Sequence, residues 1–291
     1  MKPVSSRTLL LAAVMLAAGC AGLPYAPGVS YQDPRLAEIP LPEEQIQRGR
    51  PHRLLDASDW IWPGSWLGKL LLWDRRVDNH RIGEETEAML ERYLAFNDLQ
   101  HVQVRLNQYA PRDEFRRLRQ NKSVGAGWRY TVGVIGWLQY TLLPGRFFGG
   151  DHYNPYSNSI SLYSDIPAVA VHEGGHAKDF ANRKWKGTYG AVYIIPFVNL
   201  YHEAVASNDA LGYLVAHEEA ELAYEGYRIM HPAYGTYVGN NLALLAPEYT
   251  LELVLGSVLT GHGTGRWAGR GVRRESSNEE QDSEIFAENL D

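Results

Sequence analysis

Several stretches of the chain repeat apolar residues at helical spacing. Residues 84–97 place an apolar stripe on one side of a predicted helix, and residues 111–120 predict a second helix that starts at a proline. HVQVRLNQY at 101–109 instead alternates apolar and polar positions, as a half-buried strand does, and SISLY at 159–163 is a second strand candidate. The pattern therefore predicts a helix-rich α+β protein with a small sheet.

Two further stretches are more strongly apolar. The segment from Trp60 to Trp73 contains four tryptophans and predicts a helix that packs on the core. An amphipathic segment lying on a membrane surface is the alternative. Residues 131–144 are shorter than the roughly 20 apolar residues that span a bilayer, so we expect them to be buried.

The second half of the chain predicts further helices. Pro167 begins one of them, and a long helix is expected from about residue 200 to residue 230. Residues 247–260 predict a final core helix, with Gly261 just past its end. The tail from residue 275 has seven acidic residues and no basic one, which is typical of a disordered segment.

The first residues have the features of a secretory signal. Lys2 and Arg7 are followed by an apolar stretch and then by LAAGC, which ends at Cys20. This pattern resembles the lipobox of bacterial lipoproteins, and an ordinary signal peptide with an incidental cysteine is the alternative. The resemblance implies a lipid attached to Cys20 and, with Ala21 next, an outer-membrane anchor facing the periplasm.

Composition and charge limit the classes of function. The chain has 291 residues, of which 45% are hydrophobic, and this suits one globular domain. Its net charge of −6 comes without a basic patch, so nucleic acid is not an expected partner. Cys20 is the only cysteine, which excludes an intrachain disulfide. We expect a signal peptide (1–19), a tether (20–55), one domain (56–270) and an acidic tail (271–291).

The sequence HEGGH at residues 172–176 lies on the helix predicted to begin at Pro167. Positions i and i+4 share one face of a helix, so the imidazoles of His172 and His176 can reach one metal ion. Glu173 would then lie beside the ion's open position, where it can take a proton from water and pass it to a leaving amine. Zinc lowers the pKa of such water to about 7. Two satisfied surface histidines are the alternative.

With its preceding strand and following helix, this stretch resembles the zincin metallopeptidases over about residues 100–230. The resemblance implies a small sheet beside the motif helix, a second long helix with the third ligand, one bound Zn²⁺ and a peptide substrate. It also implies that residues 159–163 form the edge strand on which an extended peptide pairs. An ordinary core strand is the alternative.

The third ligand decides the subclass of zincin. The metzincin pattern HExxHxxGxxH fails, because residues 179 and 182 are Asp and Asn. Gluzincins instead use a glutamate on a downstream helix, and Glu203 in YHEAVASNDA is similar to that pattern. His202 would point about 100° away on the same helix. Glu218, Glu219 and Glu221 would lie more than about 20 Å further along a continuous helix.

The pattern leaves more than one candidate for the residue that orients the ligands. Many gluzincins have an aspartate four positions after the glutamate ligand, where this chain has Ser207. The carboxylate that accepts an imidazole N–H is therefore expected from Asp179 or Asp209. A developing oxyanion also needs donors, and the candidates are Tyr193, Tyr201, His217, Tyr227 and His231.

Taken together, these residues predict a membrane-anchored zinc metallopeptidase of the bacterial cell envelope, with Glu173 as general base. A zinc amidase acting on cell-wall crosslinks is one alternative. A catalytically silent zincin-fold lipoprotein that serves as an assembly factor is another. The intact Glu173 favours an enzyme over the silent protein, because a protein without turnover has no need of the base.

Overall fold

A computed structural model describes residues 25–28, 34–35, 39, 41–50, 52–54, 56 and 63–288, with side chains as far as residue 275. Two compact units make up the described chain, one of residues 26–207 and the other of residues 208–288 with Tyr25. The expected signal peptide, Cys20, Trp60 and Trp62 lie outside the described residues.

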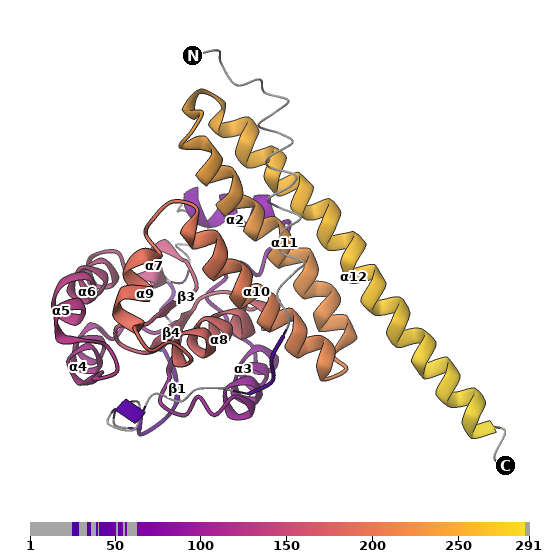
Figure 1. Cartoon of the computed structure of the whole chain (residues 1–291), viewed down its shortest axis with the longest axis horizontal. Helices are drawn as coiled ribbons and strands as arrows, with labels where there is room; N and C mark the ends of the chain where they lie inside the picture. Colours follow the sequence, from indigo (N-terminus) through magenta and orange to yellow (C-terminus); the bar gives the residue numbers. More distant parts are fainter. Residues whose placement is uncertain are drawn as a thin grey trace. The chain divides into compact units, whose positions relative to one another are not determined.

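The unit of residues 26–207 contains a four-stranded mixed sheet in the order β1-β2-β4-β3, three of whose strands are labelled in Figure 1. β1 (Ile46–Arg48), β2 (Gln103–Leu106) and β4 (Ser159–Leu162) are parallel, and β3 (His152–Asn154) pairs antiparallel with β4. The two predicted strands are thus confirmed as β2 and β4. The expectation that 159–163 is an edge strand is wrong, because β4 is paired on both sides and β3 takes the edge. β1 lies within the segment expected to be a tether.

One face of this sheet is apolar. Side chains alternate between the two faces along each strand, and the pairing of β2 with β4 sets their apolar residues next to one another. The residues of this face are completely buried: Val104, Leu106, Ile160 and Leu162. α8 (Pro167–Ala181) contacts β3 and β4 and packs along α3 (Glu84–Phe96). α8 is therefore a central helix of the unit, and almost all of its residues are buried.

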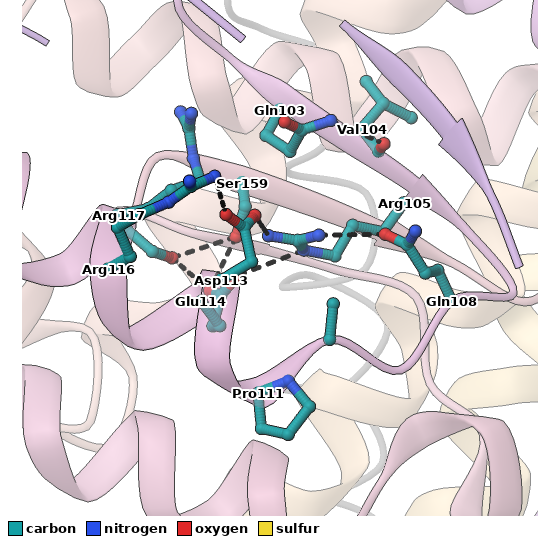
Figure 2. A network of polar contacts seen from close by, with 12 residues as sticks. Gln103, Val104, Arg105, Gln108, Pro111, Asp113, Glu114, Arg116, Arg117 and Ser159 are labelled. Atoms are coloured by element: carbon teal, nitrogen blue, oxygen red, sulfur yellow. Dashed lines mark hydrogen bonds and ion pairs between the residues drawn. The ribbon is translucent and has the colours of Figure 1, made fainter. Parts of the chain in front are cut away.

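The opposite face is polar and is held by buried charges. Arg105 on β2 has no exposed side-chain surface, and its guanidinium pairs with Asp113 and Glu114 of α4 (Pro111–Gln120), as Figure 2 shows. Glu114 also accepts a hydrogen bond of 2.7 Å from Ser159 on β4. A buried charge is costly unless it is paired and hydrogen-bonded. The network therefore fixes α4 against the sheet.

The helical elements that complete this unit confirm its helix-rich α+β class. α3 starts where Asp165 accepts a 2.7 Å hydrogen bond from the backbone N–H of Gly83. The others are α2 (Pro63–Leu72), α5 (Ala126–Trp128), the π-helical η4 (Arg129–Gly133), α6 (Val134–Leu142), α7 (Gly145–Phe148), α9 (Lys186–Val192) and the first part of α10 (Val198–Ala216).

Two apolar helices are more exposed than their sequences predict. In α2, Trp66 is 49% and Leu70 is 60% exposed, and in α6, Ile135 is 65% and Leu142 is 72% exposed. The expectation of burial is therefore wrong for these four residues, although Val134 and Trp137 of α6 do pack against the core around Leu118. An apolar sequence predicts that a helix has its apolar side chains covered, but it does not show which element covers them.

The second unit contains a hairpin of α11 (Ala220–Ala243) and α12 (Thr250–Glu288), joined through a 3₁₀ turn at Pro247–Tyr249. Glycines let the two backbones approach, since a Cβ at Gly261 would lie 2.4 Å from the carbonyl oxygen of His231. Gly261 is therefore a packing residue, and the predicted helix end there is wrong. α12 continues to Glu288 through the segment expected to be a disordered tail. None of the described helices is both long and apolar enough to cross a bilayer.

Candidate metal centre

The two histidines of the HEGGH motif lie one turn apart on α8. Their ring centroids are 4.7 Å apart, and the ring planes are nearly perpendicular, at 81°. His176 is 9% exposed, so the pair is nearly enclosed by the unit. This is the arrangement expected from an i, i+4 spacing on one helix.

Glu203 on α10 faces both imidazoles. Its Oε2 lies 3.4 Å from Nε2 of His172, and its Oε1 lies 3.5 Å from Nε2 of His176. Ligand atoms around a tetrahedral zinc lie about 3.3 Å apart, because each metal–ligand bond is about 2.0–2.1 Å long. The ligand atoms of the three side chains all lie within 4.8 Å of one another, so these residues form a possible metal-binding triad.

The two glycines of the motif make room for other elements. A Cβ at Gly175 would lie 2.8 Å from the carbonyl oxygen of Ala206, so α10 approaches α8 at this point by its backbone. A Cβ at Gly174 would lie 2.6 Å from ring carbons of Tyr93 on α3. Gly175 thus allows the approach that brings Glu203 to the histidines, while Gly174 accommodates a different helix.

Glu173 is a buried carboxylate beside the triad. It is 5% exposed, and within the described chain its Oε2 has no hydrogen-bond partner. Burial raises its pKa above the ordinary glutamate range, and the two neighbouring imidazoles only partly oppose this. A carboxyl with a raised pKa and a free oxygen is suited to taking up and releasing a proton.

The triad itself is a coupled set of charges. Burial opposes protonation of His176, but the carboxylate of Glu203 outweighs it and raises the His176 pKa to about 9. Burial likewise opposes ionisation of Glu203, and the two imidazoles outweigh that effect and lower the Glu203 pKa. The carboxylate of Glu203 is therefore stabilised by the imidazolium form of its neighbours.

Ser207 contacts the imidazole of His172, and this contact was not among those predicted from the sequence. Its hydroxyl lies 3.3 Å from Nδ1 of His172, one turn after Glu203 on α10. Asp179, one of the two carboxylates expected to accept an imidazole N–H, instead accepts hydrogen bonds from Arg183 and from the Tyr189 hydroxyl, the latter at 2.6 Å. The signal for Ser207 was its position four residues after the glutamate, where many gluzincins have aspartate.

Asp209 belongs to the other unit, where its charge is close to the phenol of Tyr25. Burial first, and the Asp209 carboxylate second, raise the Tyr25 pKa to about 12. The expectation that Asp209 accepts an imidazole N–H is supported by no hydrogen bond to His172 or His176 in the described chain.

The other residues considered as third ligands, His202 and the glutamates from 218 to 221, are not part of the triad. His202 is 1% exposed and stacks on Tyr189, with a centroid distance of 4.1 Å, and neither ring nitrogen has a hydrogen-bond partner in the described chain. The predicted continuous helix from 200 to 230 is wrong, because α10 ends at Ala216 and Glu218 has a positive φ of 60°. Glu221 pairs with Arg273 in the second unit.

Tyr193 is the candidate oxyanion donor that contacts the triad. Its hydroxyl donates a short hydrogen bond to Oε1 of Glu203. Tyr201 is 48% exposed and accepts a long contact of 3.5 Å from Arg183. The other candidates lie in the second unit: His217, Tyr227 and His231.

Comparisons with protein-family models, with curated proteins and with solved structures gave no match.

Proposed function

We propose that this protein is a zinc-dependent hydrolase, and specifically a peptidase. His172, His176 and Glu203 are the metal ligands, and Glu173 is the general base. The observation that supports this most is the convergence of three ligand atoms, all within 4.8 Å of one another, beside a buried carboxylate that is not itself part of the triad.

The donor set favours zinc. Two imidazole nitrogens and one carboxylate oxygen form the three-ligand set that catalytic zinc sites use, with one position left for water or substrate. When bound, zinc would polarise a substrate carbonyl and make water acidic enough to ionise near neutral pH. The tyrosine bond to Glu203 and the serine contact to His172 hold the ligands in orientation, as supporting hydrogen bonds do in metal sites.

Glu173 then carries the proton in this proposal. As a carboxylate it accepts a proton from the attacking water, and its enclosed position keeps bulk water from competing for that proton. As a carboxylic acid, favoured by the raised pKa, it donates the proton to the departing amine. The carboxylate is restored when the amine leaves, so one residue serves both steps.

An extended peptide is the substrate that suits the sheet. β3 pairs on one side with β4, and it forms an edge of the described sheet. α8, which carries the histidines, contacts β3. A peptide that pairs with such an edge is held by its main chain, so affinity comes with little sequence preference. Zinc amidase activity on cell-wall crosslinks would use the same metal centre without this pairing.

The test compares two variants of the metal centre. Glu173→Gln is expected to keep close to one zinc per chain and to lose casein hydrolysis by at least about a thousandfold, because an amide neither accepts nor relays the proton. Glu203→Ala is expected to lose the zinc itself, whereas the exposed Glu221→Ala keeps it. Bound zinc is measured by atomic absorption.

Either of two results would overturn the proposal. The first is full hydrolysis by Glu173→Gln with zinc present, and the second is unchanged zinc in Glu203→Ala. If the protein digests purified peptidoglycan and not casein, the substrate is the cell-wall crosslink and not a protein. The proposed metal centre would be unaffected by that result.

We also propose that the chain is anchored in the cell envelope through Cys20, on the sequence LAAGC. Cys20→Ala is expected to move most of the protein from the membrane fraction to the soluble fraction, or to block its processing, because the lipid is attached to that sulfur. Fractionation and immunoblotting measure this. Unchanged retention after a high-salt wash, with normal processing, would contradict the lipid anchor.

A further inference from the structure

A cleft of about 800 Å³ lies at the carboxyl ends of two parallel strands, and none of the triad residues lines it. Its wall includes Arg48 and Gly49 at the end of β1 and Asn107 just after β2. β1 and β3 are at opposite ends of the sheet order (Figure 1). α8, which carries the two histidines, contacts β3. Clefts at the carboxyl ends of parallel strands are frequent ligand sites.

The floor of this cleft is fixed by hydrogen bonds. The amide nitrogen of Asn107 donates to Oδ1 of Asp56 at 3.0 Å and to the carbonyl of His80 at 2.9 Å. Its oxygen is therefore the acceptor for Nδ1 of His80, 3.2 Å away. Both His80 and Asn107 have a left-handed backbone, with φ of 59° and 46°, so the surrounding contacts hold the floor in one unusual conformation.

The charges of the cleft do not cancel. Asp56 accepts a 3.0 Å bond from Arg146, and this bond helps to lower its pKa against the effect of burial. Arg48 donates to the carbonyl of Ile82 and pairs with Glu87. Arg53 and Arg81 are exposed at the cleft, and neither guanidinium is paired within the described chain. Two positive charges are thus left for a ligand on a chain whose net charge is −6.

We propose that this cleft binds a phosphate-bearing anion through Arg53 and Arg81. A phosphate monoester carries a charge of about −1.5 to −2 at pH 7, which matches two guanidinium groups. Arginine binds phosphate oxygens in a forked, two-bond geometry. The cleft is also of the size that small-molecule sites have, about 300–1,000 Å³, so it leaves room for an organic body beyond the phosphate. That body is either a soluble metabolite or a lipid headgroup.

Titration calorimetry with inorganic pyrophosphate tests the binding, with the full chain carrying Cys20→Ser so that no acyl group contributes. Arg53→Gln/Arg81→Gln is expected to weaken pyrophosphate binding by at least about tenfold. The matched control is Arg112→Gln/Arg119→Gln, which removes the same charge from exposed positions on α4 that do not line the cleft. This control is expected to bind within about twofold of the parent chain, with both variants keeping the parent's melting temperature.

Flotation with vesicles then distinguishes the source of the phosphate. Binding to vesicles of phosphatidic acid and phosphatidylcholine that is lost in Arg53→Gln/Arg81→Gln and displaced by pyrophosphate would assign the cleft to a lipid headgroup. Pyrophosphate binding without such vesicle binding would assign it to a soluble phosphate ester. The proposal is overturned if the parent chain does not bind pyrophosphate, if citrate binds in its place, or if the control variant weakens binding as much as the cleft variant does.

Discussion

Ser207 shows at the scale of one residue how a hydroxyl can take a place expected for a carboxylate. A metal-bound imidazole needs a partner on its second nitrogen that fixes its tautomer and ring orientation. Ser207 provides an oxygen 3.3 Å from Nδ1 of His172, and it adds no charge to a centre that already holds Glu173 and Glu203. A neutral partner therefore keeps the buried site from becoming more negative.

Ser207→Ala is expected to weaken zinc binding by about tenfold, because loss of such supporting bonds typically costs 10- to 100-fold in metal affinity. Competition with a zinc-binding dye measures the affinity. Ser257→Ala is a suitable control, since Ser257 is also buried and its hydroxyl has no hydrogen-bond partner in the described chain. Equal affinity in Ser207→Ala and the parent chain would show that the serine does not orient the imidazole.

The residues of the candidate metal triad could be predicted one by one, but their hydrogen-bond partners could not. His172 and His176 share a local helical spacing, which the sequence contains in full. Tyr193 reaches Glu203 only because the chain turns between α9 and α10, and Ser207 reaches His172 only because α10 packs on α8. By its spacing alone, Asp179 was an equally suitable acceptor for an imidazole N–H. In the structure it accepts hydrogen bonds from Arg183 and Tyr189 instead.

At the scale of elements, the position of Glu203 depends on how closely α10 approaches α8. Gly175 allows this approach, because the carbonyl oxygen of Ala206 occupies the space that a side chain would need. The obstacle is backbone, which moves only if the helix moves. The close approach of the two helices is therefore part of the geometry of the candidate metal centre.

Gly175→Ala is expected to weaken zinc binding by more than about tenfold and to lower the free energy of unfolding by about 1–3 kcal/mol, as overpacking does. Gly136→Ala provides the contrast. Gly136 lies within α6 with nothing near the added methyl group, so the change is expected to stabilise the protein by about 0.5–1 kcal/mol. Zinc competition and urea unfolding measure both effects. Gly175→Ala with unchanged zinc affinity would show that the approach does not set the ligand geometry.

Local patterns predicted several elements and failed where distant contacts decide. α3, α4 and α8 begin at or next to their predicted starts, because prolines and apolar periodicity are local signals. The break between α10 and α11 falls in AHEEAE, which has neither proline nor glycine, so sequence favoured a continuous helix. Gly261 was predicted as a helix end because its partner, the backbone of α11, is remote in sequence.

At the scale of the whole molecule, the sheet depends on buried charge as well as on apolar packing. Arg105 is completely buried in the polar face, and α4 supplies both carboxylates that pair with it (Figure 2). Its alternation with Val104 and Leu106 was visible in the sequence, but the charged side was expected to face solvent. The strand is instead covered on both faces, because α4 brings the opposite charges to it.

This network predicts how stability depends on pH. Burial alone would raise the pKa of Asp113, but the hydrogen bond and charge of Arg105 outweigh it and lower that pKa below the unfolded value of about 3.9. A group with a lowered folded-state pKa binds its proton more readily in the unfolded chain. Its contribution to stability is therefore complete above the unfolded pKa and is lost as the pH falls through the folded pKa.

The expected result is a free energy of unfolding that is level with respect to this group above about pH 5 and declines below about pH 4. Asp113→Asn is expected to be less stable than the parent chain at pH 7 and to show a smaller decline between pH 5 and pH 3, because one of the carboxylates responsible is gone. Glu91→Gln, an exposed position on α3, is the control and should follow the parent curve. Urea unfolding at each pH measures these curves. An Asp113→Asn curve parallel to that of the parent would show that the ion pair with Arg105 does not contribute to acid sensitivity, and would leave the buried arginine stabilised by Glu114 alone.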